Sequence, residues 1–589
     1  MKRPALVLLS AFLTLLAGCS GGSTGAAQGA GTVTLALTDS ATDELTQFEV
    51  DVDAVVFHKA SGATVSVLPR ATRVDFLQLE SVSELVAVGS LPGGFYDRVT
   101  LTLDFSTASV LIVGQTTPAA VLDEAGDAIT GAFDVDVDLT TGARPFVRAG
   151  RGQLFVLDLD LDQSLAVDAG GNSVTFAPVW SVADDTDAAS PVLTSGTLQS
   201  IDLANDTFYV ERRAVDDTVI DVFAVRSAST TVYQLGGVVS LGDFGLGQLS
   251  GFLGQYVYVQ GTFDRQAGAI DAVAVETGAG VVGNGQDWVF GHVVARSGGA
   301  GADATLTVLG RSRDVGTSTR RYNTLHTVDV SLADTKVLRR GFGNTYDSDD
   351  VNVGQLVWIF GDLTGTAMDA SGADGVVRMV RTSIFGVANG AVSGGELSLD
   401  VTRFDRRDVS QFDFDVSGQV QADPDAFVVD VTGLSTSGID SGTNVRVIGF
   451  VSAVGASGAD ASAVSLVDRT AGPKLLQCGW APSATGVLGV SGSAITVDIA
   501  GATLAVVRDG FSPTTLTASP TPSVVGLGTV GFYRIVQDGG VALYTSFDAF
   551  RAAVDNRVGS AAVRRVNGLG RFDAGTQVFS ALTATVVLD

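Results

Sequence analysis

The chain has 589 residues, the length of about four average domains, and 46% of them are hydrophobic, which excludes a largely disordered protein. Its formal net charge of −28, from 64 acidic and 36 basic residues, disfavours nucleic acid and anionic lipid headgroups as partners and favours weak, diffuse cation binding. Asp outnumbers Glu by 56 to 8 and there are 72 Gly, so the composition predicts an all-β protein with many turns.

The amino terminus begins with a basic pair, Lys2 and Arg3, and continues with an apolar run from Ala5 to Leu16. This run is too short to span a bilayer as a mature helix and has the length of a signal-peptide core. The sequence Leu16-Ala17-Gly18-Cys19 follows and resembles the lipobox of bacterial lipoproteins. The resemblance implies that residues 1–18 are a signal peptide and that Cys19 carries a diacylglycerol thioether. The alternative is an ordinary secretory signal with a cysteine there by chance.

Residues 19–31 are small and almost uncharged, and we expect them to form a flexible tether. In lipoproteins of Gram-negative bacteria, an aspartate after the lipidated cysteine commonly marks retention in the inner membrane. Ser20 stands at this place, so the resemblance implies a lipid anchor in the outer membrane, on the periplasmic face or the cell surface. No later stretch is apolar for long enough to predict a transmembrane helix.

Residues 32–188 predict a β-domain, because apolar and polar residues alternate along several short runs. Strands are expected at 32–38, 48–57, 97–104, 132–139 and 153–161, and a helical turn within 75–88. Four segments occur in the order seen in domain of unknown function 4382: VTLALTD (33–39), VDFLQLE (74–80), LPGGFYDRVTLTLDF (91–105) and LFVLDLDLDQS (154–164). That domain is found in bacterial surface and periplasmic lipoproteins. The resemblance implies a β-sandwich-like domain and brings no activity with it.

Two runs of alternating aspartates lie in this domain: Asp134, Asp136 and Asp138, and Asp158, Asp160 and Asp162. Because side chains alternate along a strand, each run is expected on one strand face. Such a face is either a calcium site, since hard oxygen ligands suit that ion, or a solvated outer face. Repulsion between carboxylates about 7 Å apart in water is only about 0.6 kcal/mol, so we interpret both runs as solvated faces.

A repeated pattern follows from about residue 192: glycine, a short alternating strand, a second glycine, a loop rich in Gly, Ala and Asp, and another strand. It occurs at 254–276, 354–380 and 442–468, where the glycine that ends the first strand is Gly261, Gly361 or Gly449. A fourth copy at 560–588 has Gly568 at this place, but Arg564 falls on an apolar position and leaves its register open. A glycine at a strand end permits a bulge or bend and lets a small sheet curl toward closure.

The repeats resemble domain of unknown function 5666, and this resemblance implies an OB-like barrel for each copy. We therefore expect an all-β protein with a β-sandwich-like domain at 32–188 and four barrel units at 192–280, 287–385, 387–470 and 483–589. Each unit is long enough to have a core of its own. OB-like barrels can bind oligosaccharides or oligonucleotides, but a fold alone does not establish a function.

Residues that could carry chemistry are few. His58, His292 and His326 lie far apart without metal-ligand spacing, and we interpret each as packed or exposed rather than catalytic. Cys478 is interpreted as a small buried residue, with a reactive thiol or an intermolecular bridge as the alternative. The acidic loop at 347–350 lacks the glycine and the final acid of a calcium loop. We therefore assign no catalytic, cofactor-binding or metal-binding residue, and one lipid-attachment residue, Cys19.

These features favour a lipid-anchored cell-envelope protein with a non-enzymatic role, a string of β-domains that binds or scaffolds a partner. Expected partners are the membrane, through the lipid on Cys19, and an envelope protein or polysaccharide; no nucleic acid and no cofactor is expected. The alternative is a metal-dependent hydrolase that acts on an envelope or extracellular substrate with scattered carboxylates. A deep pocket that gathers three carboxylates or a histidine would favour the enzyme.

Overall fold

The computed structural model describes residues 29–589 apart from residues 41, 60, 80–81, 124, 140–144, 186–190, 417–421, 471, 481–486, 509–513, 529–530, 539 and 559. The expected signal peptide, Cys19 and all but the last residues of the expected tether lie outside the described residues. The described chain consists mainly of β-strands in several sheets, which confirms the predicted all-β fold class. No helix in that part of the chain is long and apolar enough to cross a membrane.

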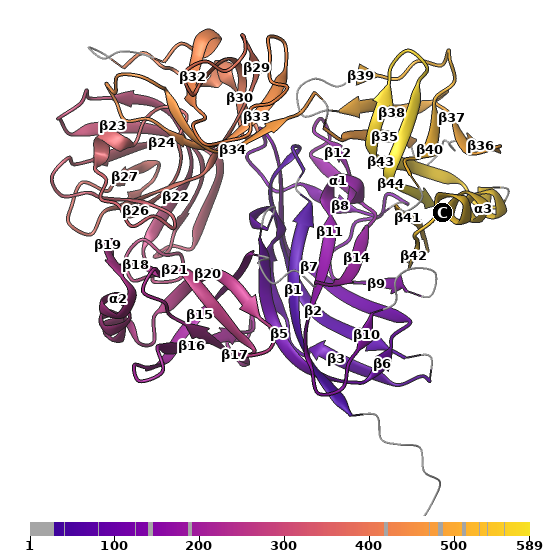
Figure 1. Cartoon of the computed structure of the whole chain (residues 1–589), viewed down its shortest axis with the longest axis horizontal. Coiled ribbons are helices and arrows are strands. Elements are labelled where there is room, and N and C mark those ends of the chain that lie inside the picture. The colour runs from indigo at the N-terminus through magenta and orange to yellow at the C-terminus, as the bar shows by residue number, and fades with distance from the viewer. Residues whose placement is uncertain are drawn as a thin grey trace, which may run out of the picture.

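A two-layered β-sandwich, which we call the central domain, occupies the middle of the molecule (Figure 1). One layer has the strand order β14-β11-β1-β5 and the other β3-β2-β7-β9, with β4 also paired to β2. Alternating residues such as Leu35 of β1 and Leu101 of β7 are fully buried between the layers. The elements are β1 (Ala30–Ser40), β2 (Leu45–His58), β3 (Thr64–Leu68), β4 (Thr72–Asp75), η1 (Phe76–Gln78), β5 (Ser83–Pro92), β6 (Gly94–Phe95), β7 (Arg98–Ile112), β8 (Ala120–Leu122), β9 (Ala132–Asp138), β10 (Phe146–Val147), β11 (Gly152–Asp160), α1 (Leu161–Ser164), β12 (Leu165–Asp168), β13 (Ser173–Phe176) and β14 (Trp180–Asp184).

The helical turn expected within 75–88 is confined to η1, and residues from Ser83 onward form β5 instead. The strand is covered on both faces, because Val86 packs into the sandwich and Leu85 packs into the core of the next unit. A strand buried on both faces shows a continuous apolar run rather than an alternation, so the period-two signal was missing here.

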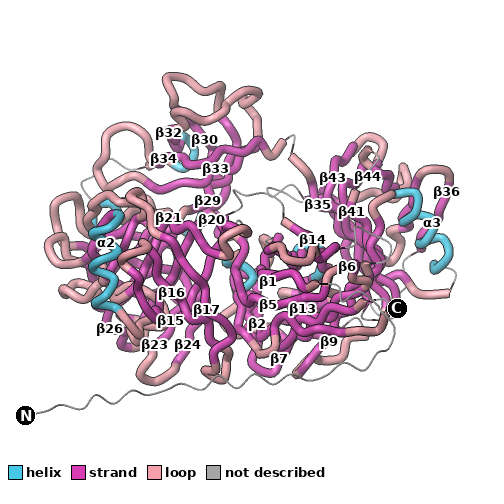
Figure 2. Tube along the Cα trace, turned by 60° about the horizontal axis from the view of Figure 1, so that its bottom comes forward, coloured by secondary structure: helices cyan, strands magenta, loops and turns pink. Residues whose placement is uncertain are grey.

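Three small barrels lie together on one side of the central domain, and a C-terminal unit lies on the other (Figures 1 and 2). Barrel 1 consists of β15 (Pro191–Asp202), β16 (Thr207–Arg213), β17 (Val219–Arg226), β18 (Val232–Leu235), β19 (Val238–Leu241), α2 (Gly242–Leu249), β20 (Tyr256–Asp264) and β21 (Ala269–Thr277). Barrel 2 consists of β22 (Asp287–Ser297), β23 (Ala304–Asp314), β24 (Thr319–Val330), β25 (Lys336–Arg339), β26 (Leu356–Thr364), β27 (Ala367–Asp369) and β28 (Val376–Val380). Barrel 3 consists of β29 (Thr382–Ala388), β30 (Glu396–Phe404), β31 (Arg407–Asp408), β32 (Phe427–Asp430), β33 (Asn444–Val451) and β34 (Ala461–Asp468). The C-terminal unit consists of β35 (Lys474–Trp480), β36 (Val487–Ser491), β37 (Ala494–Asp498), β38 (Ala502–Arg508), β39 (Thr514–Thr515), β40 (Ser523–Gly526), β41 (Phe532–Gln537), β42 (Gly540–Tyr544), α3 (Phe547–Val558), β43 (Val563–Asp573) and β44 (Val578–Leu588).

The three barrels share one pattern of strand pairing. We number the five main strands of each barrel in chain order; in barrel 1 they are β15, β16, β17, β20 and β21, and the hairpin β18–β19 is not counted. The first strand, β15, pairs antiparallel with the second, β16, and with the fourth, β20. The third strand, β17, pairs in parallel with the fifth, β21, which also pairs with β20 and so closes the ring. In barrel 2 the first four positions are held by β22, β23, β24 and β26, and the fifth by the pair β27–β28. In barrel 3 the five positions are held by β29, β30, β32, β33 and β34. This is the strand order of a closed, OB-like Greek-key barrel.

Gly261, Gly361 and Gly449 lie at the same point of the fourth strand, where its pairing with the fifth strand is interrupted. The register shifts at Gly261 and Gly449, and around Gly361 the partner strand divides into β27 and β28. A Cβ at any of the three would lie less than 3.0 Å from a carbonyl oxygen of the partner strand. Glycine is therefore required here by the close approach of two backbones at a bulge.

The C-terminal unit settles the register of the fourth repeat. Its register shift falls between Leu569 and Gly570, and a Cβ on Gly570 would lie less than 3.0 Å from the carbonyl oxygen of Ser580. Gly570, and not Gly568, is therefore the equivalent of Gly261. The residue four positions before it is then Val566, which is buried as the pattern requires.

The units are joined more closely than a string of separate domains. Strand β5 pairs in parallel with β15 of barrel 1, and β9 pairs in parallel with β42 of the C-terminal unit, so each layer of the sandwich continues into a neighbour. Barrels 2 and 3 share one hydrophobic core, so the expectation of a separate core for each is wrong. Strand pairing also starts barrel 3 at Thr382 and the C-terminal unit at Lys474, rather than at 387 and 483.

Candidate functional site

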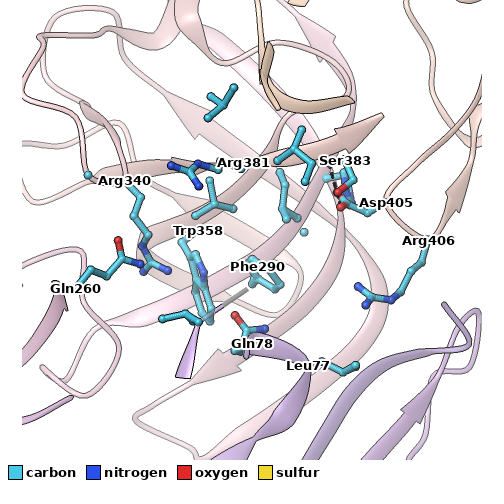
Figure 3. Close-up of a pocket in the computed structure, with 18 of the residues that line it drawn as sticks. Leu77, Gln78, Gln260, Phe290, Arg340, Trp358, Arg381, Ser383, Asp405 and Arg406 are labelled. Atoms are coloured by element: carbon cyan, nitrogen blue, oxygen red, sulfur yellow. Dashed lines mark hydrogen bonds and ion pairs between the residues drawn. The ribbon is translucent and has the colours of Figure 1, made fainter. Parts of the chain in front are cut away.

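A cavity of about 800 Å³ lies where barrels 1, 2 and 3 meet the central domain (Figure 3). Its wall includes residues of the first and fourth strands of each barrel, of η1 and neighbouring parts of the central domain, and of the turn between β30 and β31. Further wall residues come from β21, β23, β24 and β34, from the segment after β25 and from the connection between β28 and β29. The wall residues of the barrel strands alternate with residues that fill the barrel cores. The cavity is therefore a space between barrels and not the interior of one, and its volume is typical of a ligand site.

One cross-strand pair recurs at the same place of the three barrels. The residue three before the repeated glycine pairs with a residue of the first strand: Tyr258 with Ser195, Trp358 with Phe290, and Arg446 with Phe385. The ring centroids of Trp358 and Phe290 are 4.4 Å apart, and the Arg446 guanidinium lies 5.5 Å from the Phe385 centroid. Tyr258, Trp358 and Arg446 all line the cavity, so the repeat brings equivalent outward-facing positions to one place.

Arginines dominate the charged groups of the wall. Among its described residues there are six Arg, one Asp and no Glu or Lys, namely Asp405 with Arg311, Arg340, Arg381, Arg406, Arg407 and Arg446. Figure 3 shows Arg340, Arg381 and Arg406 extending from different sides of the cavity around Trp358 and Phe290. The wall thus concentrates positive charge in a chain whose net charge is −28.

Two of the six arginines are neutralised by carboxylates of neighbouring units. Arg311 lies 3.1 Å from Oδ2 of Asp75 in the central domain, and Arg340 lies 3.1 Å from Oε1 of Glu276 in barrel 1. Glu276 also pairs with Arg378, at 3.2 Å. These pairs connect barrel 2 to its neighbours, so packing of the units is sufficient to explain them.

Arg381 lies in the connection between β28 and β29, Arg406 and Arg407 lie at the turn between β30 and β31, and none of the three forms an ion pair with a carboxylate of the described chain. Arg381 is exposed, and within that chain it has no hydrogen-bond partner. Arg406 donates from Nε to the carbonyl oxygen of Thr42 at 2.8 Å, and Arg407 donates from Nη1 to Oδ1 of Asn323 at 3.0 Å. Arg407 is 9% exposed, and burial lowers the pKa of its guanidinium to about 10. Asp405 favours the charged form of Arg407, but it is the one carboxylate among the described wall residues against these three guanidinium groups.

Asp405, the one acid of the wall, is held by partners within the wall. Its Oδ2 lies 2.7 Å from Nε2 of His292, and its Oδ1 accepts a hydrogen bond from the backbone N–H of Ser383 at 3.1 Å. Burial opposes ionisation of Asp405, but the hydrogen bond from His292 and the nearby cationic groups outweigh it and lower the pKa of Asp405. Burial also lowers the pKa of His292. The charge of Asp405 is thus shared among His292, the Ser383 backbone and the neighbouring Arg406 and Arg407.

A second chamber of about 410 Å³ adjoins the first, and Gln78, Tyr258, Arg311, Arg340 and Trp358 line both. Its described charged residues are balanced, with four Arg and four acids: Arg311, Arg313, Arg320, Arg340, Glu49, Asp75, Glu84 and Glu276. The positive excess is therefore confined to the first chamber.

The structure brings one of the three histidines, His292, into the cavity wall. His58 lies on β2, where its Nε2 is 2.8 Å from Oγ1 of Thr100, and His326 is fully buried in β24, where burial lowers its pKa to about 4. Cys19, the expected lipid-attachment residue, lies outside the described residues. No group of three or more His, Cys, Asp or Glu that could hold a metal occurs within the described ranges.

Cys478 is buried, as expected, and burial raises the pKa of its thiol to about 12. It pairs with Val566, and the equivalent of Val566 in barrel 1 is Val257, which pairs with Gly196. Cys478 therefore takes the place of a first-strand glycine in the repeat, and a structural role is sufficient to explain it.

The first aspartate run lies on β9 at the surface, as expected. Asp134 is exposed, Asp136 and Asp138 are half-buried, and Arg98 pairs with Asp136 at 3.1 Å.

The second aspartate run is not a solvated face, so that expectation is wrong. Strand β11 ends at Asp160, which is 8% exposed, and Asp162 lies in α1. Burial raises the pKa of Asp158 to about 6 and also raises those of Asp160 and Asp162. The C-terminal unit covers this run, with Arg534 3.8 Å from Asp160, and such packing cannot be read from strand alternation.

Comparison with known proteins identifies the central domain alone. A family model described as Domain of unknown function (DUF4382) matches residues 30–178, about a quarter of the chain. This match supports the resemblance seen in the sequence. No curated protein matches the chain.

The residues of the cavity wall were not predicted from the sequence, because the arginines of the wall are scattered between residues 311 and 446 and form no local motif. One signal could have indicated them: the position three before each repeated glycine holds Tyr258, Trp358 or Arg446, all large side chains on the outer face of the strand.

Proposed function

We propose that this protein is a lipid-anchored cell-envelope protein with a non-enzymatic binding role, and that its ligand is anionic and occupies the cavity between the barrels. The observation that carries the proposal is the cavity wall, where Arg381, Arg406 and Arg407 form no ion pair with a carboxylate of the described chain and Asp405 is the one acid among the described wall residues. This wall belongs to a chain of net charge −28. The lipobox-like sequence at Cys19 and the short tether after it support the envelope location.

The energetics of buried charge explain why this wall favours an anion. A cationic group removed from water is costly unless a partner compensates its charge. Arg407 is 9% exposed and donates to the uncharged amide of Asn323. The charge of its neighbour Asp405 is shared with His292 and Arg406, so a further oxyanion would improve the environment of Arg407. Guanidinium groups bind oxyanions through paired, charge-assisted hydrogen bonds, each contributing about 1.5–3 kcal/mol.

The test is calorimetric titration of the full-length protein in detergent with citrate as a small anionic probe and trimethyl citrate as its uncharged match. We expect saturable binding of citrate and none of the ester. Arg381→Ala should weaken citrate binding about tenfold, the loss of roughly 1.4 kcal/mol, because the exposed guanidinium is removed without disturbing a described contact.

The matched control is Arg571→Ala, which removes an exposed arginine from β43 in the C-terminal unit and should leave citrate affinity unchanged. If citrate does not bind, or if both variants bind it as tightly as the wild type, the cavity is not an anion site.

The lipid anchor has its own test. Cys19→Ala should abolish incorporation of a fatty-acid analogue, because it removes the proposed thioether position, and circular dichroism should show an unchanged β-sheet signal. The proposed acylation with several chains would anchor the protein stably, since a single chain gives only marginal membrane binding. Equal labelling of variant and wild type would exclude the anchor.

An enzyme is the second candidate function, and His292 is the observation that favours it. His292 lines the cavity, and its contact of 2.7 Å with Asp405 fixes one ring nitrogen, as in many general bases. Prolonged incubation with a bound ligand, followed by mass spectrometry, separates the two functions. An unchanged ligand supports binding alone, whereas products that disappear with His292→Gln would identify an enzyme.

A further inference from the structure

We infer that the ligand of this cavity is an extended acidic saccharide, a sugar chain in which some rings carry oxyanion groups. The inference rests on the proposed anionic ligand and adds its chemical class. Four features of the two chambers lead to it: their shape, the repeated wall, the uncharged hydrogen-bonding groups and the distribution of charge.

The shape favours an elongated ligand. The chambers of about 800 and 410 Å³ share five wall residues and therefore adjoin. Each lies in the range of roughly 300–1,000 Å³ that holds one drug-sized ligand, so the two together suit a longer molecule.

Equivalent strand positions recur along the cavity wall, as repeating units recur along a polymer. Tyr258, Trp358 and Arg446 hold the same strand position in successive barrels and line the first chamber. Tyr258 and Trp358 also line the second chamber. A chain with repeating units can therefore meet equivalent wall positions as it extends from one chamber to the next.

The uncharged groups of the wall match sugar hydroxyls and sugar rings. Amides and hydroxyls, which both donate and accept hydrogen bonds, come from Gln78, Gln260, Ser383 and Ser465, of which Ser383 already accepts a hydrogen bond from Arg446. Figure 3 shows Gln260 beside Arg340 and Gln78 below Phe290. Half-buried rings, those of Tyr258, Phe290 and Phe342, add apolar surface for the C–H face of a pyranose.

The distribution of charge argues against a ligand that is charged at every bond. The arginines that form no ion pair with a described carboxylate, Arg381, Arg406 and Arg407, line the first chamber and not the second. The second chamber holds Glu84 and Glu276, and a uniform polyanion such as polyphosphate would place its charges beside them. A saccharide with separate acidic groups can direct an oxyanion to the arginines and uncharged hydroxyls to the second chamber.

The experiment is calorimetric titration of the full-length protein in detergent with a galacturonate oligomer, its methyl ester, a sulfated galactan oligomer and polyphosphate. We expect at least one of the two acidic saccharides to bind about tenfold more tightly than citrate and polyphosphate. The tighter of the two then distinguishes a carboxylated from a sulfated ligand. The methyl ester should bind at least about tenfold more weakly than the galacturonate oligomer if the carboxylates carry the affinity.

Two variants separate the parts of the site. Arg381→Ala should weaken both the preferred acidic saccharide and citrate, because it removes charge. Gln260→Ala should weaken binding of the saccharide several-fold and leave binding of citrate unchanged. Gln260 lies in barrel 1, whereas Arg381, Arg406 and Arg407 come from barrel 3 or from the connection that leads into it.

The outcomes keep the two proposals apart. If citrate binds through Arg381 but neither saccharide binds more tightly than citrate or polyphosphate, the saccharide inference is wrong and the anionic ligand stands. If Gln260→Ala leaves saccharide affinity unchanged, the extension toward barrel 1 is wrong. If no anion binds, both proposals fail.

Discussion

Two buried aspartates, Asp39 and Asp160, and two half-buried ones, Asp158 and Asp162, lie close together at the seam between the central domain and the C-terminal unit. Burial raises the pKa of each, and repulsion from neighbouring carboxylates raises those of Asp39, Asp158 and Asp162 further. Arg534, which is 3% exposed, is the facing cation and lies 3.8 Å from Asp160. The protonated forms of these acids therefore suit the seam better than the charged forms.

Asp158 gives this seam a predictable pH dependence. Its pKa is about 6 in the fold against 3.8 for the free side chain, so its contribution to stability is complete below about pH 4 and is lost as pH rises through 6. Asp158→Asn retains an uncharged side chain of similar shape. It should raise the free energy of unfolding by roughly 2 kcal/mol at about pH 8 and hardly at all at about pH 4.

Urea unfolding at the two pH values measures this effect. Asp134→Asn, an exposed member of the other aspartate run, should change stability at neither pH. An equal gain for Asp158→Asn at both pH values would show that its charge is not responsible.

The fourth strand of each barrel contains the repeated glycine, and substitution of Gly261 tests whether barrel 1 requires it. Gly261→Val should destabilise barrel 1 by several kcal/mol, because its Cβ would lie less than 3.0 Å from the backbone carbonyl oxygen of Asp271. Gly247→Ala in α2 is the matched control within barrel 1, since a Cβ there meets nothing within 4 Å. It should be neutral or stabilising by up to about 1 kcal/mol.

Hydrogen exchange read by mass spectrometry can localise the effect. For Gly261→Val, exchange should rise first in β15, β20 and β21. Unchanged exchange in these strands would show that the bulge tolerates a side chain.

Sequence reasoning succeeds where a pattern reflects a local requirement. The strands β2, β7 and β9 have one buried and one polar face, so alternation placed them within a few residues except at the far end of β7. The repeated glycines mark a contact between two backbones that only glycine permits, so they located the fourth strands. For β5, burial on both faces removed the alternation. The cavity depends on how whole barrels pack, and Arg381 and Arg407 show no local pattern that reveals their shared wall.

At the scale of the whole molecule, the central sandwich connects the flanking units through its sheet edges. Strand β5 is covered by β15 of barrel 1, and β9 is covered by β42 of the C-terminal unit. These pairings cover one edge of each layer, that of β5 and that of β9, and prevent it from pairing with another chain. The net negative charge favours solubility, while Arg406 is half-buried and Arg407 buried in the cavity wall, where screening by salt is weaker than at the surface.

The shared core of barrels 2 and 3 predicts that the two unfold together. Phe404 of barrel 3 is fully buried beside Phe412 and Phe427, and its ring lies so close to Gly354 of barrel 2 that a Cβ there would be 2.8 Å from it. Phe404→Ala should therefore destabilise both barrels by about 3–5 kcal/mol, the usual cost of such a cavity. Hydrogen exchange should rise in β22–β26 and β29–β34 alike, while β2 and β7 of the central domain stay protected. Phe244→Ala, at a side chain that is 70% exposed on α2, should change neither barrel. If exchange rises in barrel 3 alone, the two barrels are independent folding units despite their common core.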